Sequence, residues 1–266
     1  MELAGRNIVI TGAGSGIGRA LALRMAAERP RCIVVADLNA AGAEAVAAEI
    51  GSTAVAVGVD VSREQEITRL VARAREAGGP IDVFFSNAGV PGPGGGPEAP
   101  DEEWQRTWEV NTMAHVWAAR AVIPEMVERG EGYLLSTASA AGLLTQVGAL
   151  AYSVTKHAAV AVAEWLAITY GDAGVRVSCL CPQGVRTPML DHALEDPIGA
   201  APLLAEGLLE PEDVAEAVIE GIREERFLIL PHPQVADYLA LKATQNERWL
   251  KGMRRLVRQV REGTGG

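Results

Sequence analysis

Short apolar runs rich in β-branched residues alternate along this chain with alanine-rich stretches of helical periodicity. The apolar runs are NIVIT (7–11), CIVVA (32–36), AVAVG (54–58), IDVFF (81–85), GYLLS (132–136), VRVSCL (175–180) and FLIL (227–230). The helical stretches cover residues 17–28, 40–50, 63–77, 102–129, 151–171 and 211–223. Strands that alternate with helices form parallel sheets covered on both faces, with right-handed crossovers. We therefore predict a three-layer, doubly wound α/β fold with a parallel sheet of about seven strands.

Three segments interrupt this alternation. Residues 91–100, PGPGGGPEAP, form a Gly/Pro loop after the fourth run, at the sheet edge where open α/β folds bind ligands. Residues 188–210 have broken periodicity, which suits a mobile flap over a site. Residues 233–260 form an amphipathic helical extension whose second half is basic. Nothing resembles a linker, a repeat or a second core, so a single domain over residues 1–266 is predicted.

Charge and hydropathy exclude several classes of protein. The chain has a formal net charge of −10, and a phosphate-binding surface needs a basic field, so no nucleic-acid partner is predicted. No uninterrupted apolar stretch approaches about 18 residues, which argues against integral membrane association. The start, MELAGRNIVI, lacks the layout of a secretory signal, so a cytoplasmic location is expected.

Cysteine and histidine positions give no sign of a metal site. Cys32, Cys179 and Cys181 stand in apolar runs without CxxC or His-partner spacing, so buried structural thiols are predicted. The histidines, at positions 115, 157, 192 and 232, are scattered without ligand spacing. We interpret them as helix or loop residues, and only His192 is placed to reach a substrate from the flap.

A glycine-rich stretch, TGAGSGIG, joins the first apolar run to the first helical stretch. Gly12, Gly16 and Gly18 have GxxxGxG spacing, and the usual GxGxxG spacing is not met because residue 17 is Ile. Glycine permits a sharp turn and lets a pyrophosphate approach the N-terminus of a helix, where free amide groups point outward. By itself the motif also fits a plain strand-to-helix turn.

Asp37 ends the second apolar run, roughly 20 residues after the glycines. A carboxylate there can accept hydrogen bonds from the adenosine ribose diol and would repel a 2′-phosphate. No Arg or Lys follows in DLNAAG, and Ser15 rather than a basic residue precedes Gly16. These features favour NAD over NADP. The alternative interpretation is that Asp37 caps the next helix.

Tyr152 and Lys156, in AYSVTKHAAV, lie four residues apart in a small, apolar helical stretch. At this spacing both side chains lie on one face of a helix. A phenol, with a pKa of about 10, is a poor base at neutral pH unless a nearby positive charge favours the phenolate. The ammonium of Lys156 would supply that charge, and an oxidised nicotinamide would add to it.

Four motifs follow one another on this pattern: TGAGSGIG, SNAG (86–89), STASAAG (136–142) and YSVTK (152–156). Together they resemble the short-chain dehydrogenase/reductase family in its compact single-domain form, over roughly residues 5 to 190. The resemblance implies a Rossmann fold with one dinucleotide-binding domain.

The resemblance also implies a set of catalytic residues. Tyr152 is implied as the base that takes the hydroxyl proton of an alcohol, and Ser139 as the residue that holds the substrate oxygen. Lys156 would also grip the nicotinamide ribose. Asn111, in WEVNTM, matches the asparagine that bends its helix around a water and links the lysine to solvent. The alternative for Asn111 is a solvated or capping amide.

Cofactor contacts follow from the same resemblance, and no metal is implied. The residues are Gly12, Ser15, Gly16, Ile17, Gly18, Asp37, Asp60, Val61, Asn87, Ala88, Gly89, Tyr152, Lys156 and Thr187. Two positions depart from the family pattern: Ser86 replaces a frequent second Asn, and Gln183 replaces the Gly that usually follows Pro182. The second departure puts the contacts of residues 182–184 in doubt.

These features predict an oxidoreductase that interconverts a secondary alcohol and a ketone with NAD(H). The leucines of the flap and the aromatic tail indicate a small to medium, mostly apolar substrate. One alternative is an NADPH-dependent 3-oxoacyl thioester reductase, which Asp37 disfavours. Another is a non-catalytic dinucleotide sensor, for which a damaged Ser, Tyr and Lys set would be expected.

Tryptophans are concentrated in residues 102–129 and 151–171. In the family these two helices pair with a partner subunit, so the resemblance implies a homo-oligomer, a dimer or a tetramer. The apolar face around Trp249 could cover the active site, pack on a partner, or meet a membrane surface through Lys251, Arg254 and the later arginines. Partner packing is the favoured interpretation.

Overall fold

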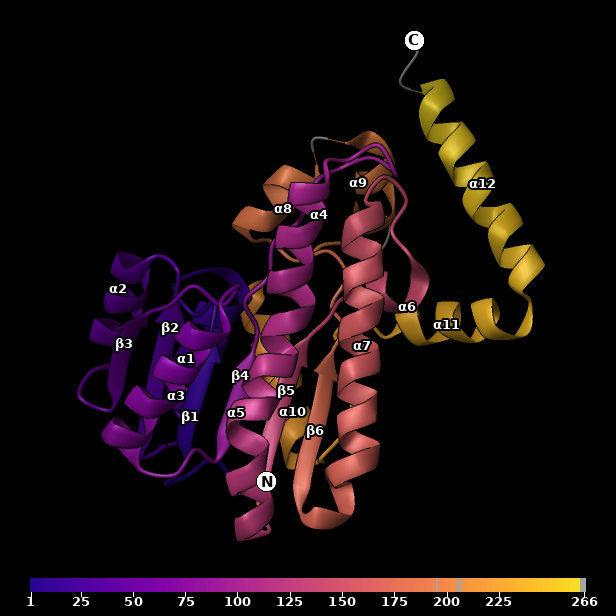
Figure 1. Ribbon diagram of the computed structural model, residues 1–266. Helices are drawn as coiled ribbons and strands as arrows, with labels where there is room; N and C mark the ends of the chain where they lie inside the picture. The colour runs from indigo at the N-terminus through magenta and orange to yellow at the C-terminus, as the bar shows by residue number, and fades with distance from the viewer. Residues whose placement is uncertain (195, 205–206, 264–266) are drawn as a thin grey trace.

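The computed structural model describes residues 1–194, 196–204 and 207–263. Within them, seven parallel strands form one sheet in the order β3-β2-β1-β4-β5-β6-β7 (Figure 1). The strands are β1 (Asn7–Thr11), β2 (Cys32–Asp37), β3 (Ala54–Gly58), β4 (Val83–Ser86), β5 (Gly132–Thr137), β6 (Val175–Leu180) and β7 (Leu228–Ile229). The predicted α/β fold is confirmed, and the strands differ from the predicted runs only at their ends.

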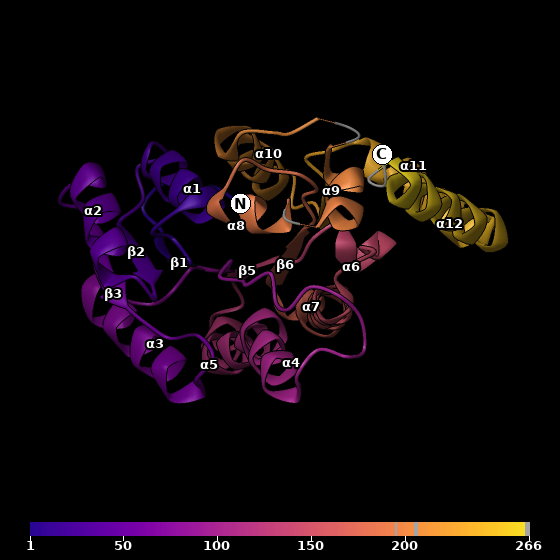
Figure 2. The ribbon, with the colours of Figure 1, turned by 90° about the horizontal axis from the view of Figure 1, so that it is seen from above.

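Helices cover both faces of this sheet (Figure 2). One face is covered by α1 (Gly16–Ala26), α2 (Ala40–Ile50) and α10 (Pro211–Arg223). The other is covered by α3 (Glu64–Gly78), α5 (Ala114–Arg129) and α7 (Leu150–Tyr170). The three predicted layers are therefore present.

Alternate residues of each strand supply the two apolar cores. In β1, Ile8 and Ile10 belong to the buried cluster that contains Leu21 of α1, whereas Val9 belongs to the cluster that contains Ile67 of α3. Burying one such side chain contributes about 1.5–3 kcal/mol. Because both faces are apolar, the central strands appear in the sequence as continuous apolar runs.

The helices differ from the predicted ranges in two places. The stretch predicted as one helix over 102–129 is α4 (Asp101–Trp108), a π-helical turn (Glu109–Met113) and α5. The C-terminal extension divides at Gln245 into α11 (Gln234–Thr244) and α12 (Asn246–Gly263). Asn246 Nδ2 donates to the carbonyl of Lys242, a local bond of the kind by which asparagine competes with helix continuation.

Three short helices lie in segments that have no helical periodicity. They are α6 (Ala141–Leu144), α8 (Pro188–Ala193) and α9 (Pro197–Leu204). The last two belong to the segment 188–210 that was expected to be a flap, of which residues 195, 205 and 206 lie outside the described part. Elements this short cannot show a helical repeat, which explains why they were not predicted.

The order of the strands positions a crevice. The chain proceeds from β1 to β2 and β3 in one direction across the sheet, and from β4 to β7 in the other. The loops that follow β1 and β4 therefore diverge at the carboxyl edge. In open α/β folds this reversal point is where ligands bind.

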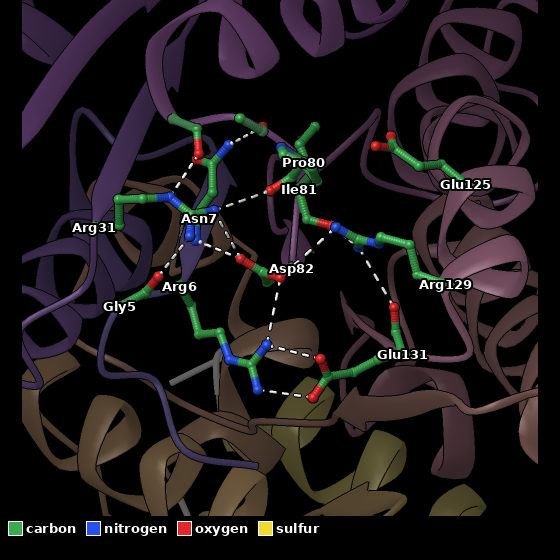
Figure 3. A network of polar contacts seen from close by, with 12 residues as sticks. Gly5, Arg6, Asn7, Arg31, Pro80, Ile81, Asp82, Glu125, Arg129 and Glu131 are labelled. Carbon is green, nitrogen blue, oxygen red and sulfur yellow. Dashed lines mark hydrogen bonds and ion pairs between the residues drawn. The ribbon is translucent and has the colours of Figure 1, made fainter.

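The opposite, amino-terminal edge is held by an ionic network around Asp82 (Figure 3). Asp82 is 8% exposed, and its Oδ2 accepts hydrogen bonds from the Asn7 amide at 2.8 Å and from Arg31 at 3.2 Å. Its Oδ1 lies 3.5 Å from Arg6 and 3.8 Å from Arg129. Because this network lies at the edge away from the crevice, we infer that it stabilises the fold and is not part of the ligand site.

Replacing Asp82 by alanine is expected to lower the free energy of unfolding by about 3 kcal/mol, because it leaves three guanidinium groups around a buried backbone amide without their carboxylate. Glu131→Gln is the matched control, since Glu131 meets Arg6 at the surface with about half of its side chain exposed, and surface pairs contribute only about 1 kcal/mol or less. Urea unfolding measures both. Equal losses for the two variants would contradict the assignment.

Candidate active site

The loops at the carboxyl ends of the strands enclose a cavity of about 1010 Å³. Every cofactor-contact residue predicted from the sequence lines it, from Gly12 after β1 to Thr187 after β6. Ser139, Tyr152 and Lys156 line the same cavity. Asn111, the remaining predicted residue, lies behind this lining.

One end of the cavity is formed by the glycine-rich turn between β1 and α1. Gly12 and Gly16 have φ angles of +64° and +50°, which favour glycine. A Cβ on Gly12 would lie 2.8 Å from Ala88 Cα, and one on Gly16 would lie 3.1 Å from Thr187 Cγ2. Ser15 precedes the first turn of α1 and makes no capping hydrogen bond with its side chain. The amide groups of that turn have no partner within the helix, so the turn is suited to bind an anion.

Asp37 lies at the end of β2 beside this turn. Its Oδ2 accepts a hydrogen bond from the Gly14 amide at 2.8 Å, and its Oδ1 accepts one from the Asn39 amide at 2.9 Å. The N-cap of α2 is Asn39, whose side chain accepts from Gly42. The alternative that Asp37 caps this helix is therefore wrong, and its carboxylate lines the cavity.

Asp60 and Val61 follow β3 at the same edge. Asp60 Oδ1 accepts hydrogen bonds from the Ser62 amide at 3.0 Å and from the Ser62 hydroxyl at 2.7 Å. Both predicted residues line the cavity next to Asp37. The turn after β3 thus forms one wall of the end that carries Asp37.

Asn87 joins the ends of three neighbouring strands. Its Nδ2 donates to the Thr11 carbonyl at 3.0 Å, and its Oδ1 accepts from the Thr137 hydroxyl at 2.9 Å. The Thr11 hydroxyl accepts from the amides of Asn87 and Ala88 at 3.0 and 3.1 Å. Sequence reasoning missed Thr11, although its place directly before Gly12 could have indicated it.

The other end of the cavity contains Ser139, Tyr152 and Lys156. Ser139 follows β5, and the other two residues lie in the first turns of α7. The Ser139 hydroxyl donates to the Pro182 carbonyl at 3.5 Å and accepts from the Ala141 amide at 3.1 Å. Lys156 is 2% exposed, its Nζ donates to the Thr137 carbonyl at 3.0 Å, and it lies 5.6 Å from the centroid of the Tyr152 ring. The predicted side-by-side arrangement of the phenol and the ammonium is present.

Burial dominates the ionisation of this pair. It raises the pKa of Tyr152 above its usual value, against the smaller lowering effect of the hydrogen bond from Ser139. Burial also lowers the pKa of Lys156 to about 8. In this structure burial therefore opposes ionisation of both groups of the pair, and the expected lowering of the phenol pKa by the Lys156 ammonium stays a prediction.

Asn111 lies in the π-helical turn between α4 and α5. It is fully buried, its Oδ1 accepts from the Val90 amide at 2.9 Å, and its Nδ2 donates to the Val90 carbonyl at 2.9 Å and to Thr155 Oγ1 at 3.3 Å. A Cβ on Gly89 would lie 3.3 Å from both Asn111 Oδ1 and Lys156 Nζ. Asn111 is thus a buried residue next to Lys156 and not a solvated amide.

His115 was not singled out by the sequence but lies close to the same residues. It is 2% exposed, one helical turn after Asn111, and neither ring nitrogen has a hydrogen-bond partner within the described protein. Burial, helped by the charge of Lys156, lowers its pKa to about 3, so the imidazole is neutral. A histidine on the apolar side of a helix gives no signal of this proximity before the fold is known.

Gln183, the departure from the family pattern, is anchored by a residue distant in sequence. Its backbone amide donates to Nδ1 of His232 at 3.2 Å, and His232 is 3% exposed. Gln183 and Pro182 both line the cavity. The altered segment is therefore held at the site by a contact that the motif alone could not indicate.

The remaining predictions concern cysteines, histidines and metals. Cys32, Cys179 and Cys181 are buried free thiols, as predicted, and the last two have sulfur atoms 3.8 Å apart. The side chain of His192 lies outside the described residues, so its contact with substrate stays a prediction. Among the described residues, no cluster of three or more His, Cys, Asp or Glu side chains could hold a metal ion.

Comparison with known proteins identifies the family. The sequence pattern of the short chain dehydrogenase family matches residues 6–197, which include every predicted site residue. The chain belongs to the short-chain dehydrogenase family. The predicted resemblance is confirmed, and this short-chain dehydrogenase is an oxidoreductase that acts on CH–OH groups.

Named relatives and one solved structure agree with this assignment. The short-chain dehydrogenase is 40% identical to 1-deoxy-11-beta-hydroxypentalenate dehydrogenase of Streptomyces exfoliatus, over 86% of this chain and 84% of that protein. It is 33% identical to mouse (Mus musculus) estradiol 17-beta-dehydrogenase 11, over 96% of this chain and 85% of that protein. A short-chain dehydrogenase/reductase from Burkholderia phymatum, crystallised with NAD, superimposes with a TM-score of 0.83 at 32% identity, over 93% of this chain and 96% of that chain.

Proposed function

We propose that this short-chain dehydrogenase interconverts a secondary alcohol and a ketone with NAD(H), on a small to medium, mostly apolar substrate. The observation that carries the proposal is one cavity with Ser139, Tyr152 and Lys156 at one end and the Asp37 carboxylate at the other. The same cavity therefore contains a base for the hydroxyl proton and a carboxylate that can recognise a ribose diol.

Each residue at the reacting end has a role in alcohol oxidation. Ser139 holds the substrate oxygen next to Tyr152, and Tyr152 accepts the hydroxyl proton. Lys156 favours the phenolate by its charge. NAD⁺, when bound, would supply the hydride acceptor and a further positive charge that favours the phenolate. Asn111 fixes the backbone of Val90 beside Lys156 and thereby shapes this end of the site.

The other end of the cavity fits a dinucleotide. A side chain on Gly12 would collide with Ala88, so glycine is needed in the turn that leads to α1. Free amide groups in the first turn of α1 would bind the pyrophosphate. Thr187 lies over Gly16 and would close on the same phosphates. The related protein crystallised with NAD supports this choice of cofactor.

The Asp37 carboxylate is expected to select NAD⁺ over NADP⁺ by repelling a 2′-phosphate. Asp37→Ser should therefore shift the ratio of kcat/KM for the two cofactors by about 100-fold toward NADP⁺, since opposed like charges cost several kcal/mol. Steady-state kinetics with both cofactors measure the ratio. Glu44→Gln, on the exposed side of α2, is the charge-matched control. An unchanged ratio in Asp37→Ser would contradict the role of Asp37.

The substrate proposal rests on the apolar part of the cavity lining. Val90, Met189, Leu190 and Leu203 contribute apolar surface to it. Two relatives are named for alcohol positions on pentalenate and estradiol, which supports an alcohol of similar character here. We also propose that the segment 188–210, with α8 and α9, covers the substrate as a flap.

The short-chain dehydrogenase is further proposed to form a homo-oligomer through α4, α5 and α7. On α7, Val154, Trp165 and Ile168 are exposed by 41%, 59% and 79%, which is unusual for large apolar side chains on one helix. A second copy would cover them.

No helix within the described residues has the length and apolar character needed to cross a bilayer. The cytoplasmic location stays a prediction.

A further inference from the structure

A strained turn separates α6 from α7 and forms part of the cavity wall. Thr145 has a φ of +71° and a ψ of 126°, a combination that β-branched residues rarely adopt. Such a conformation persists only where surrounding contacts impose it, and it is found preferentially at functional sites. The next residue, Gln146, lines the cavity together with Gly148 and Ala149.

Ser153 holds this turn from α7. Its hydroxyl accepts a hydrogen bond from the Gln146 amide at 2.9 Å and donates to the Gln146 carbonyl at 3.0 Å. Ser153 is 2% exposed, so no water competes for these bonds. A single side chain thus fixes both backbone groups of Gln146.

Lys242 reaches from α11 to α6, the helix that leads into the turn. Its Nζ donates to the carbonyl of Leu143, the residue two before Thr145, at 2.6 Å, and lies 3.5 Å from His157 Nε2. His157 Nδ1 lies 2.8 Å from the Ser153 carbonyl. One tautomer satisfies both contacts, because Nδ1–H donates to the carbonyl while Nε2 accepts from the ammonium.

The C-terminal extension therefore packs on α6, which leads into the turn, as well as bonding to it. Val235 of α11 is fully buried in a cluster with Ala140 and Leu144 of the α6 region. In Figure 1, α11 lies against α6 below α9. The position of α11 is thus coupled to the shape of the turn.

The flap meets the other side of the same turn. Gly148 has a φ of +82°, and a Cβ there would collide with the carboxylate of Asp196. Asp196 in turn accepts from the amides of Ile198 and Gly199, at the start of α9. Gln146 Nε2 lies 3.6 Å from the position of a Cβ on Gly199. The turn is enclosed between the flap and the bonds from Ser153 and Lys242.

We propose that Gln146 is a specificity-determining residue for the substrate, and that Ser153 and Lys242 are positioning residues that hold it. The inference deepens the proposed function and rests on it, since it assigns Gln146 to the alcohol or ketone that Ser139 and Tyr152 bind. The side-chain amide of Gln146 can donate a hydrogen bond to, or accept one from, a polar group of the substrate beyond the reacting carbon. The C-terminal helix α11 is thereby part of the substrate site without entering it.

Kinetics of Ser153→Ala and Lys242→Met test the positioning. Both variants are expected to raise KM for the alcohol by about tenfold, with kcat changed by less than about twofold, because the substrate site loosens while Tyr152 and Lys156 stay in place. The NADH Kd and the pH profile of kcat should not move. Lys251→Met, an exposed lysine of α12, is the matched control. Unchanged KM in both variants, or parallel loss of NADH binding, would overturn the proposal.

Gln146→Leu tests specificity directly. Between two alcohols that differ by one polar group away from the carbinol, it should shift the ratio of kcat/KM by about tenfold toward the apolar member. An unchanged ratio would overturn the assignment of Gln146.

Hydrogen exchange of the Gln146 amide gives a readout that needs no turnover. In the whole chain with NADH bound, this amide should exchange at least about tenfold faster in Ser153→Ala and in Lys242→Met than in the wild type or Lys251→Met. Equal exchange in all four proteins would overturn the positioning role. If the wild type oxidises no alcohol while exchange changes as expected, the proposed function fails and the coupling of α11 to the turn stands.

Discussion

Replacing Tyr152 by phenylalanine is expected to lower kcat for alcohol oxidation by about 10³- to 10⁴-fold, the upper range for loss of a general base. Phenylalanine keeps the ring that Lys156 faces at 5.6 Å, so the packing of the site is retained. Ser139 alone would then contact the substrate oxygen, and a serine hydroxyl does not ionise near neutral pH. The NADH Kd should stay within about twofold, because the ring and the glycine-rich turn are intact.

Stopped-flow or steady-state absorbance of NADH measures the first effect, and calorimetric titration with NADH measures the second. Tyr170→Phe is the matched control, since Tyr170 packs edge-on against Trp165 at the far end of α7. Its kcat should equal that of the wild type. If the Tyr152→Phe enzyme keeps more than about one tenth of the wild-type kcat, Tyr152 is not the base.

Lys156→Met is expected to have the second largest effect, a fall in kcat/KM of about 10²- to 10³-fold. Methionine fills a similar volume but removes the ammonium that opposes the effect of burial on Tyr152. Burial already raises the pKa of this phenol, so loss of the charge must raise it further. Oxidation requires the phenolate, hence the rising limb of the pH profile of kcat/KM should move to higher pH.

The pH profile distinguishes this electrostatic role from a purely structural one. A packing defect would lower kcat/KM by the same factor at every pH, whereas loss of the ammonium should be least harmful at high pH. At high pH the wild type also loses this ammonium, because burial lowers the pKa of Lys156 to about 8. The two proteins should therefore differ least there. Lys251→Met, which removes an exposed lysine, should reproduce the wild-type profile. A rising limb that does not move in Lys156→Met would contradict the role of the charge.

The sheet could be predicted because its central strands are buried on both faces. NIVIT and VRVSCL coincide with β1 and β6, since a strand covered on both faces is rich in apolar residues on both of its sides. The short helices α6, α8 and α9 have too few residues for a repeat, and the π-helical turn at Glu109–Met113 interrupts a stretch whose periodicity looks continuous. These elements depend on contacts between distant parts of the chain.

The same distinction separates the two groups of site residues. Most predicted residues that line the cavity stand in motifs directly after strands, where the topology of the sheet brings them together, and Tyr152 and Lys156 stand in a helical motif. Residues that hold them in place are separated in sequence from their partners: Thr11 is 76 positions from Asn87, and Lys242 is 99 positions from Leu143. No local pattern indicates such pairs. The direction in which the pKa of Tyr152 is shifted could not be predicted either, because burial raises it and burial depends on the fold.

The most direct test of the account follows NADH absorbance during reaction of the wild type with a size-graded panel of secondary alcohols. NAD⁺ and NADP⁺ are run in parallel, with Tyr152→Phe as the blank and NADH binding established beforehand by calorimetry. The account predicts reduction of NAD⁺ by at least one apolar alcohol, much slower reduction of NADP⁺, and no signal in the blank. Preference for NADP⁺, or no reduction of either cofactor by any alcohol despite proven NADH binding, would contradict it.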